Sequence, residues 1–374
     1  MSSPRLRVVI AGTGMISELH RRAAVLGGAE IIGVLGSSLE RSRDAAAKWG
    51  IAGAYASLDE VIDAQPDLVH ICTPNQFHYS YAMALLAAGI NVVCEKPLGL
   101  TLAEAQEMDA AATAADLVAT VPFVYRFHPL VREIRARRIA GELGDLNLIH
   151  GSYLQDWMLS PSAASWRVDP KAGGASRAFA DIGSHWCDLV EWVTGQRFVE
   201  VSAATSIAYA QRPAGSAAAF SSAAAGTEMI DVTTEDIAVA QFRTDAGILA
   251  STTISQVAGG RKNRLWFELD GSRGSAVFDQ ENPESAWFGS PTGSTTVVRD
   301  PGSNSPDAAR LSSLPAGHAQ GYAFCFEAFV ADTYAAVRGE EREGLPTFVD
   351  GARSATIVDA VLASASQRAW TPIR

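Results

Sequence analysis

The sequence predicts an α/β domain with a doubly wound parallel sheet, followed by an α+β domain built on a largely antiparallel sheet. Three observations support this prediction. The chain has 374 residues, which is more than one small core requires. Apolar runs alternate with helix-like segments up to residue 121, and strand-like segments then follow one another after Pro122 with little helix between them. We therefore expect a first domain at residues 1–123 and a second domain at residues 124–374.

The first domain is expected to alternate apolar strands with helices. Ser57 and Thr101 each precede a glutamate by three residues, a spacing typical of a capping box at the start of a helix. Glycines stop several of the helices. The expected strands are Leu6–Ala11, Glu30–Leu35, Asp67–Cys72, Asn91–Cys94 and Leu117–Val121; the expected helices are Met15–Gly27, Leu39–Trp49, a short one from Ser57, Phe77–Ala88 and one from Thr101 to about Ala115.

The second domain is expected to contain mainly strands, with two helices near its end. Residues 210–226 are rich in Ala, Ser and Gly and are predicted to form a surface loop, and residues 282–314 are also loop-like. The expected strands are Gly144–Asp156, Val199–Ile207, Thr233–Phe242, Gly247–Gln256, Arg264–Asp270 and Ser275–Phe278; the expected helices are Tyr322–Val337 and Gly351–Ser366.

Composition excludes several classes of function. The net charge of −11 argues against nucleic acid or an anionic membrane surface as a partner. No apolar run approaches the roughly 20 residues of a membrane helix, and the first apolar run is too short for a secretory signal, so we expect a cytoplasmic protein. The four cysteines are far apart and are expected to be reduced, mostly buried thiols, and no metal site is predicted.

A glycine-rich turn joins the first strand to the first helix. Its sequence is Gly12-Thr13-Gly14-Met15-Ile16-Ser17. In a dinucleotide fingerprint the first glycine makes the tight turn, the second lets the backbone approach the pyrophosphate, and the third allows close helix packing. Ser17 replaces the third glycine but is small. The turn therefore predicts nucleotide binding at the start of the first helix.

The end of the second strand bears on the choice of cofactor. An acidic residue there would hold the ribose hydroxyls of NAD, but the sequence continues with Gly36, Ser37 and Ser38, and Arg41 follows. Two serines and an arginine could accommodate the 2′-phosphate of NADP. Alternatively, Ser38 merely caps the next helix and Arg41 lies on its solvated face. The residues leave NAD and NADP both open.

Two further strands end in polar sequences at the same edge of the predicted sheet. One leads into Thr73-Pro74-Asn75 and His78, where Asn75 is a candidate donor to the cofactor and His78 either touches the cofactor or is an ordinary first-turn residue. The other leads into Glu95-Lys96-Pro97. Lys96, placed against a nicotinamide site, could hydrogen-bond or relay a substrate proton. We also predict a cis peptide bond between Lys96 and Pro97.

Asp181 and His185 stand four residues apart at the start of an apparent helix. This spacing places both side chains on one face. A carboxylate and an imidazole on one face can hold a substrate hydroxyl and move its proton. Asp188 follows on the same helix and is expected to be solvated.

Together these motifs resemble the glucose–fructose oxidoreductase / inositol dehydrogenase / rhizopine-catabolism (Gfo/Idh/MocA) family. The likeness runs nearly end to end. It rests on Gly12-Thr13-Gly14, Thr73-Pro74-Asn75 with His78, Glu95-Lys96-Pro97, Tyr125-Arg126-Phe127 with Pro129, Gly173-Gly174, Asp181-x-Gly183-x-His185, Val232-Thr233-Thr234-Glu235-Asp236 and Val349-Asp350-Gly351.

The resemblance implies a Rossmann domain followed by an open-faced sheet that lines the substrate cleft and often builds a homodimer or homotetramer. It implies Lys96, Asp181 and His185 as the catalytic trio. It also implies cofactor contacts from the glycine turn, the three polar segments described above, Arg126, Trp166 and Arg167. Substrate contacts are expected from Tyr125, Tyr153, Gln155, Asp156, Arg167 and His318, besides the trio.

The function that follows is transfer of a hydride between NAD(H) or NADP(H) and a ring hydroxyl of a sugar, glycoside or anhydrosugar. Tyr153–Trp157, Arg177 and the segment from His318 to Tyr322 are similar to a branch of levoglucosan dehydrogenases and glycoside 3-dehydrogenases, which favours NAD. Three alternatives remain: an inositol or cyclitol dehydrogenase, a glycosidase that uses transient oxidation by bound NAD, and a non-catalytic nucleotide-binding sensor.

Overall fold

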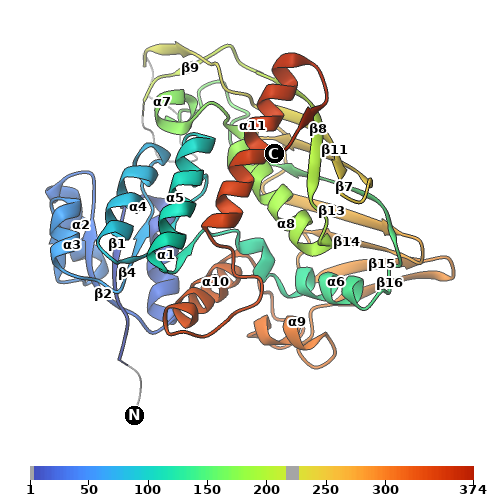
Figure 1. Ribbon diagram of the computed structural model, residues 1–374, viewed down its shortest axis with the longest axis horizontal. Helices are drawn as coiled ribbons and strands as arrows, with labels where there is room; N and C mark the ends of the chain where they lie inside the picture. Colours follow the sequence, from blue (N-terminus) through green and yellow to red (C-terminus); the bar gives the residue numbers. More distant parts are fainter. Residues whose placement is uncertain (1–3, 216–226) are drawn as a thin grey trace. The chain divides into compact units, whose positions relative to one another are not determined.

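The computed structural model describes residues 4–215 and 227–374. The chain divides into two compact units (Figure 1). The first unit consists of the chain up to Pro122 together with two later segments, Lys171–Gly174 and Phe326–Ala355. The second consists of Phe123–Pro170, Ala175–Cys325 and Thr356–Arg374.

The first unit is built on a parallel sheet, as the sequence predicts. Within the described residues it has six strands in the order β3-β2-β1-β4-β5-β6. The chain builds the sheet outward in one direction from β1 and in the other direction from β4, so the order of the strands reverses between these two neighbours. In such sheets the loops that follow the two strands border the place where ligands bind. The strands are β1 (Arg7–Ala11), β2 (Glu30–Leu35), β3 (Gly53–Tyr55), β4 (Leu68–Ile71), β5 (Asn91–Cys94) and β6 (Ala119–Thr120).

Local sequence signals account for the helices of this unit. Ser57 and Thr101 cap their helices as predicted, because each hydroxyl accepts a hydrogen bond from the backbone N–H three residues on. The strand β3 was not predicted; its three residues pair with β2 alone. The helices are α1 (Met15–Leu26), α2 (Leu39–Trp49), α3 (Leu58–Asp63), α4 (His78–Ala87), α5 (Leu102–Ala115) and α7 (Pro170–Gly173).

Alternate strand residues face different helices. Val69 and Ile71 of β4 belong to a buried apolar cluster with residues of α4 and α5. His70, between them, bonds instead to His20 of α1 and Tyr334 of α10 (Tyr322–Val337). The sheet is therefore covered on both faces, which is the doubly wound arrangement that the alternating sequence predicts.

The second unit is built on a mixed, mostly antiparallel sheet. Within the described residues its strand order is β16-β15-β14-β13-β7-β12-β11-β8-β17, and only the β7–β12 pair in this sheet is parallel. The strands are β7 (Leu146–Leu154), β8 (Phe198–Ser206), β11 (Ile237–Thr244), β12 (Leu249–Ser255), β13 (Arg264–Gly271), β14 (Ser275–Asp279), β15 (Ser285–Ser290), β16 (Gly293–Val298) and β17 (Thr371–Pro372).

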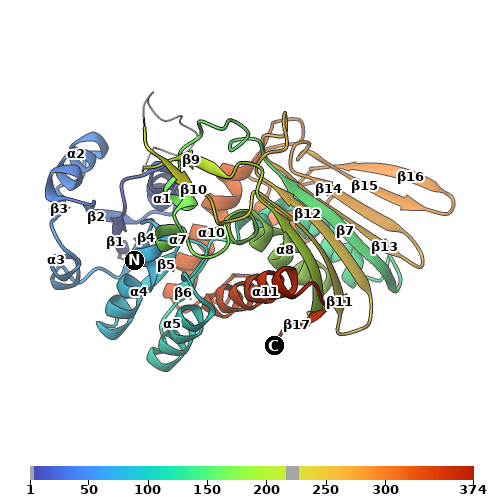
Figure 2. The same cartoon turned by 90° about the horizontal axis from the view of Figure 1, so that it is seen from above.

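One face of this sheet packs on helices and the other is open. Figure 2 shows α8 (Ser184–Thr194) and the end of α11 (Phe348–Gln367) along one side of the strands. The helix α6 (Pro129–Ile139) adds Leu130, Val131 and Ile134 to the same core. Phe198, Phe242 and Trp186 stack in the core of this side. On the opposite face Val239 and Leu249 are about half exposed, at 47% and 49%.

Three predictions for the second domain need correction. Residues 282–314 were expected to be a loop but contain β15, β16 and α9 (Pro306–Leu311). The apolar signal there is weak, because β15 buries only alternate residues and β16 is almost wholly exposed. The predicted loop at 210–226 begins with β9 (Gln211–Pro213), which pairs with β10 (Met229–Asp231); residues 216–226 lie outside the described part. The helix α6 was also missed.

The cysteines are as predicted: all four of Cys72, Cys94, Cys187 and Cys325 lie in the described residues, are buried and form no disulfide. Burial raises the pKa of the Cys72, Cys94 and Cys325 thiols, the last to about 12, so these thiols stay protonated and inert. Between residues 4 and 374, leaving aside 216–226, no helix has the length and hydropathy needed to cross a bilayer.

Candidate active site

The glycine turn has the geometry of a dinucleotide site. Gly12 has a φ of +127°, and a Cβ on it would lie 2.5 Å from the carbonyl oxygen of Cys72, so only glycine fits. A Cβ on Gly14 would meet nothing within 4 Å. Gly14 is extended, and the helix α1 starts at Met15 without a side-chain cap, so its first N–H groups face outward beside an open space. An anionic pyrophosphate fits both the space and the helix end.

The residues after the glycine turn do not decide between NAD and NADP. Ser17 is fully buried, so a small side chain does suit this position. The Ser38 hydroxyl accepts a hydrogen bond from the N–H of Arg41 and caps α2, while Ser37 and Arg41 are exposed. No acidic side chain therefore stands at the end of β2. A 2′-phosphate contact from these residues stays a prediction.

The segment after β4 is tied to its neighbours by two polar side chains. The Asn75 amide donates to the carbonyl of Gly173 at 3.0 Å. The two ring nitrogens of His78 lie 2.9 Å and 3.0 Å from the carbonyls of Pro97 and Thr73. His78 is fully buried, and its ring nitrogens face the turns that follow β4 and β5. Cofactor contact by Thr73, Pro74, Asn75 and His78 stays a prediction.

Lys96 follows β5 at the same edge of the sheet. The peptide bond between Lys96 and Pro97 is cis, as predicted. Glu95, one residue earlier, is 8% exposed, and its two oxygens accept from His20 (3.0 Å) and from the Lys96 backbone N–H (3.2 Å). Burial raises the pKa of Glu95, but the His20 hydrogen bond and nearby positive charges outweigh it, so the pKa ends below its ordinary value. Glu95 is a buried carboxylate.

Asp181 and His185 lie in the second unit, where one helical segment carries both. The segment opens with a π-helical turn (Phe179–Gly183) and continues as α8, so its start is wound more loosely than the α-helix that the spacing suggested. The N–H of Ser184 bonds the carbonyl of Phe179, five residues back. Such turns often occur at functional sites, because they displace a side chain without ending the helix.

Glu235 anchors the start of this segment. Its carboxylate accepts from the Ser176 hydroxyl (2.7 Å), the Arg177 N–H (3.1 Å) and the Phe179 N–H (2.8 Å). Glu235 is 4% exposed, and the next residue, Asp236, is fully buried and pairs with Arg177. A carboxylate that satisfies the first N–H groups of a helix stabilises it there.

Asp181 is oriented by two side chains of the same unit. The Gln256 amide donates to its Oδ2 at 2.8 Å, and the Arg167 Nε lies 3.9 Å from its Oδ1. The Arg167 guanidinium in turn lies 4.5 Å from the ring centre of Trp166. The structure thus brings together Asp181 and Arg167, both predicted, and adds Gln256, which no local pattern in the sequence indicated.

Aromatic rings surround His185, which is 5% exposed. The rings of Tyr125, Phe123 and Tyr153 have their centres 5.4, 5.6 and 6.3 Å from the imidazole. The Tyr125 and Tyr153 hydroxyls are 2.7 Å apart. Burial raises the pKa of Tyr125 to about 12 and raises the pKa of Tyr153 well above its ordinary value, so both keep their protons at neutral pH.

Asn263 joins these tyrosines to Gln155. Its Oδ1 accepts from the Tyr153 hydroxyl (2.7 Å) and the Gln155 amide (2.9 Å), and its Nδ2 donates to the Tyr125 hydroxyl (3.0 Å). Trp157 donates to Gln155 in addition. Tyr125, Tyr153 and Gln155 were predicted to contact substrate, and the structure places all three in one network. Asn263, which links them, was not predicted.

Two other predicted site residues, Arg126 and Asp156, belong to separate interactions. Arg126 forms a bidentate ion pair with Asp188, which is buried and not solvated as the sequence suggested. Asp156 accepts from the Lys262 ammonium (2.7 Å) and the Gly260 N–H (3.0 Å), and the Lys262 hydrogen bond lowers its pKa. A cofactor contact by Arg126 and a substrate contact by Asp156 stay predictions.

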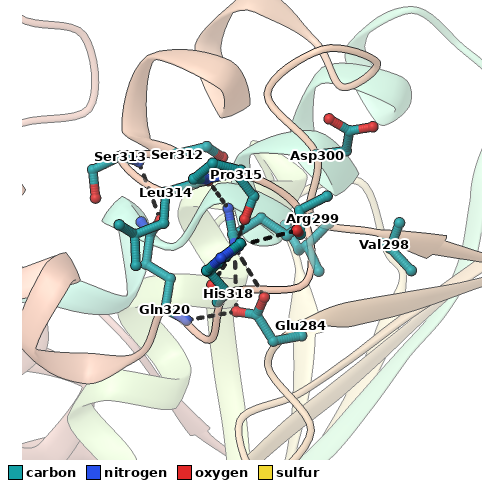
Figure 3. A network of polar contacts seen from close by, with 12 residues as sticks. Glu284, Val298, Arg299, Asp300, Ser312, Ser313, Leu314, Pro315, His318 and Gln320 are labelled. Carbon is teal, nitrogen blue, oxygen red and sulfur yellow. Dashed lines mark hydrogen bonds and ion pairs between the residues drawn. The ribbon is translucent and has the colours of Figure 1, made fainter.

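Figure 3 shows that His318 lies in a loop held by a buried arginine. Arg299 donates to the carbonyls of Leu314, Pro315 and His318 and pairs with Glu284. The His318 side chain is exposed. The backbone of His318 is therefore held in place, while its ring faces solvent. Contact of His318 with substrate stays a prediction.

Chemically, the described residues offer two sets of groups. The first unit supplies a phosphate-binding helix end and Lys96 at one sheet edge. The second supplies a carboxylate, an imidazole and a cluster of hydroxyl and amide groups beside aromatic rings. Among the described residues, His150, Glu268 and Asp270 also bring ligand atoms within 4.8 Å of one another, but they are partly exposed and lie in neither set. The absence of a metal site remains a prediction.

Comparison with known proteins identifies the family. Residues 6–123 match the profile of the GFO_IDH_MocA oxidoreductase family, NAD-binding Rossmann fold, and residues 131–277 match the GFO/IDH/MocA C-terminal domain. The chain belongs to this family. The predicted fold class and the predicted resemblance are therefore both confirmed, and the chain is an oxidoreductase with an NAD-binding domain.

Several members of the GFO/IDH/MocA family are similar along much of their length. A levoglucosan dehydrogenase from Pseudarthrobacter phenanthrenivorans is 32% identical over 349 residues, which cover 89% of this chain and 87% of the relative. The D-glucoside 3-dehydrogenase of Escherichia coli is 29% identical over 52% of this chain and 56% of its own. A levoglucosan dehydrogenase structure in complex with NADH and levoglucosan superposes with a TM-score of 0.89 at 27% identity, covering 99% of this chain and 100% of the other.

Two matched variants test whether the glycine turn binds the cofactor. Gly14→Ala places a methyl group in the open space beside α1, so the fold should persist while the affinity for NADH falls at least about tenfold, or roughly 1.4 kcal/mol. Gly12→Ala should instead lower the melting temperature, because its methyl group would collide with the Cys72 carbonyl. Fluorescence titration and thermal denaturation separate the two effects. Unchanged NADH binding by Gly14→Ala would show that the cofactor lies elsewhere.

The contact of Gln256 with Asp181 generates a second prediction. Gln256→Leu keeps the volume but removes the donor, and a hydrogen bond to a charged group contributes about 1.5–3 kcal/mol. We expect kcat/KM to fall roughly 10- to 100-fold with little change in melting temperature, because Gln256 Oε1 has no hydrogen-bond partner among the described residues. Gln241→Leu, at an exposed position of β11, is the control. Equal activities of the two variants would remove Gln256 from the site.

Proposed function

We propose that this protein oxidises or reduces a ring hydroxyl of a sugar, glycoside or anhydrosugar, with Lys96, Asp181 and His185 as the catalytic residues. The observation that supports this most is the lining around His185. The hydroxyls of Tyr125 and Tyr153 and the amides of Asn263 and Gln155 suit a ligand rich in hydroxyl groups. Aromatic rings beside them suit the apolar faces of a pyranose. The named relatives, a levoglucosan and a glucoside dehydrogenase, agree with this class of substrate.

The nicotinamide cofactor, when bound, accepts or supplies the hydride, which no side chain can do. Gly12–Ile16 would hold its pyrophosphate at the start of α1. We propose NAD for this role, because the levoglucosan dehydrogenase structure that resembles this chain contains NADH. The exposed Ser37 and Arg41 leave room for NADP, so both cofactors belong in the test.

His185 and Lys96 would manage the proton of the reacting hydroxyl. His185 is buried among aromatic rings and is suited to take or return a proton without competition from bulk water. Lys96 would donate a hydrogen bond to the same oxygen and stabilise the negative charge that develops on it. Of the two, His185 has the fixed surroundings that a general base requires.

Asp181 would orient the substrate rather than move the proton. Gln256 and Arg167 both approach its oxygens, which holds the carboxylate in one direction. A carboxylate fixed in this way accepts a hydrogen bond from a neighbouring ring hydroxyl and selects one face of the sugar. The hydroxyl–amide network of Tyr125, Tyr153 and Asn263 would then define which sugars fit.

The experiment that tests the function is a substrate panel. Absorbance of reduced nicotinamide would be followed at neutral and alkaline pH with NAD and NADP supplied separately, against glucose, levoglucosan, aryl glucosides and inositols. We expect turnover of a pyranose or anhydropyranose. Release of aglycone from the aryl glucosides without net cofactor reduction would indicate a redox glycosidase instead. A silent panel despite cofactor binding would favour a sensor.

A lysine variant tests the catalytic assignment on the substrate that the panel identifies. Lys96→Ala should lower kcat at least about 100-fold, because it removes the group that stabilises the reacting oxygen. Its affinity for the cofactor should change little. Lys48→Ala, a highly exposed lysine on α2 of the same unit, is the matched control and should behave as the unaltered protein. Near-normal turnover by Lys96→Ala would contradict the assignment.

A further inference from the structure

A chain of four buried polar side chains leads to the residue before Lys96. The Tyr334 hydroxyl lies 2.8 Å from Nε2 of His70, whose Nδ1 lies 2.9 Å from Nδ1 of His20. Nε2 of His20 lies 3.0 Å from Oε1 of Glu95. Tyr334, His70 and His20 are fully buried, and Glu95 nearly so. All belong to the first unit, and they come from α10, β4, α1 and the end of β5.

The hydrogen bonds of this chain have a defined direction. Among the described residues, His70 is the one hydrogen-bond partner of the Tyr334 hydroxyl. A buried hydroxyl proton without an acceptor is costly, so Tyr334 must donate to Nε2 of His70. Burial lowers the pKa of His70 well below its ordinary value, so His70 is neutral and its single proton is on Nδ1.

The same reasoning fixes the proton of His20. Nδ1 of His70 donates to Nδ1 of His20, which therefore accepts and carries no proton there. The proton of His20 is on Nε2 and is donated to Glu95, which as a carboxylate can only accept. Every link has one donor and one acceptor, and all donors point from Tyr334 toward Glu95.

We propose that His20, His70 and Tyr334 are positioning residues for Lys96, acting through Glu95. Their one-directional chain holds Glu95 as an oriented carboxylate, and the second oxygen of Glu95 accepts the backbone N–H of Lys96 at 3.2 Å. The chain thereby fixes the start of the turn from which the Lys96 side chain leaves the sheet. The proposal rests on the proposed catalytic role of Lys96 and adds three residues that sit outside the expected site.

Glu95 must be charged for this arrangement to exist. Both of its partners, Nε2–H of His20 and the Lys96 N–H, are donors. A glutamine presents one accepting oxygen and one donating NH₂ group, so it cannot accept from donors on both sides at once. In Glu95→Gln, Tyr334 still sets the direction of the chain, so the amide oxygen must accept from Nε2–H of His20 and the Lys96 N–H loses its acceptor. The tautomers of His20 and His70 would stay the same, while the hydrogen bond to the Lys96 turn would be lost.

The tautomers of the two histidines give a readout that does not depend on activity. ¹⁵N NMR of the imidazole rings distinguishes protonated from unprotonated nitrogens, and His20 and His70 can be assigned by single substitution. We expect Nε2–H on His20 and Nδ1–H on His70 in the unaltered protein and in each of the single variants Glu95→Gln and Tyr334→Phe, because one end of the chain still sets the direction. In the double variant neither end sets it, so both nitrogens of His70 should shift toward mixed values. A doubly protonated His20, or Nε2–H on His70, in the unaltered protein would overturn the chain.

Kinetics test whether the chain positions Lys96. His20→Leu leaves Glu95 with one donor fewer, and a displacement of about 1 Å at a catalytic group can cost about 100-fold. We expect kcat to fall about 10- to 100-fold while the dissociation constant for NADH changes little. His20→Gln, whose amide can still donate to Glu95, should restore most of the loss. Tyr79→Phe, which removes a surface hydroxyl–carboxylate bond of the same unit, should change nothing.

The outcomes separate this proposal from the proposed function. If Lys96→Ala abolishes turnover but His20→Leu retains it, the positioning role is wrong and the function stands. If the NMR pattern is as expected but Lys96→Ala retains turnover, the function has failed although the chain exists. A parallel fall of kcat and NADH affinity in His20→Leu, without rescue by His20→Gln, would reduce His20 to a packing residue and overturn the proposal.

Discussion

The arrangement of the candidate site depends on one buried carboxylate. Glu235 accepts hydrogen bonds from Ser176, Arg177 and Phe179 at the start of the segment that presents Asp181 and His185. A helix that begins inside a protein leaves N–H groups without partners, and Glu235 supplies the acceptors. Its neighbour Asp236 neutralises the buried Arg177 in the same turn. Without Glu235 and Asp236, the π-helical turn would contain buried donors without acceptors and an unpaired guanidinium. The backbone that carries Asp181 and His185, the two proposed catalytic residues of this unit, would then no longer be held in place.

Each unit contributes by a different physical means. In the proposed function, the first unit would bind its cofactor through the backbone of a glycine turn and a helix end, where Gly12 and Gly14 carry no side chains. The second unit would use side chains, whose positions are set by hydrogen bonds between distant strands. The hydroxyl–amide network of Tyr125, Tyr153 and Asn263 joins three elements in this way. The backbone site suits a cofactor shared by a family, whereas the side-chain site can vary with the substrate.

Features that depend on neighbouring residues in the chain were predictable. The caps at Ser57 and Thr101, the glycine turn and the alternating elements of the first unit are local, and the structure has them. Features set by distant partners were not. The helix α6 carries four arginines, and its burial becomes clear only when Arg132 is seen to pair with Asp307.

The same distinction applies to the site. Asp181 and His185 were found because they are four residues apart, whereas Gln256 and Asn263 approach from separate strand ends with no motif around them. Asp188 was misjudged because its partner Arg126 lies 62 positions away. Glu95 stood within a recognisable motif, but its contact with His20, 75 positions away, required the structure. Sequence therefore indicates which residue types the chemistry needs, and the tertiary contacts decide which of them are oriented.

The proposed function requires Lys96 and His185 to act on one hydroxyl of a sugar. A crystal structure of the complex with NADH and the substrate that the panel identifies tests this requirement. We expect Lys96 Nζ and a ring nitrogen of His185 both to lie within about 3.2 Å of the same sugar oxygen, with Asp181 on an adjacent hydroxyl. A sugar whose reacting hydroxyl is bound by neither Lys96 nor His185, next to a correctly placed nicotinamide, would contradict it.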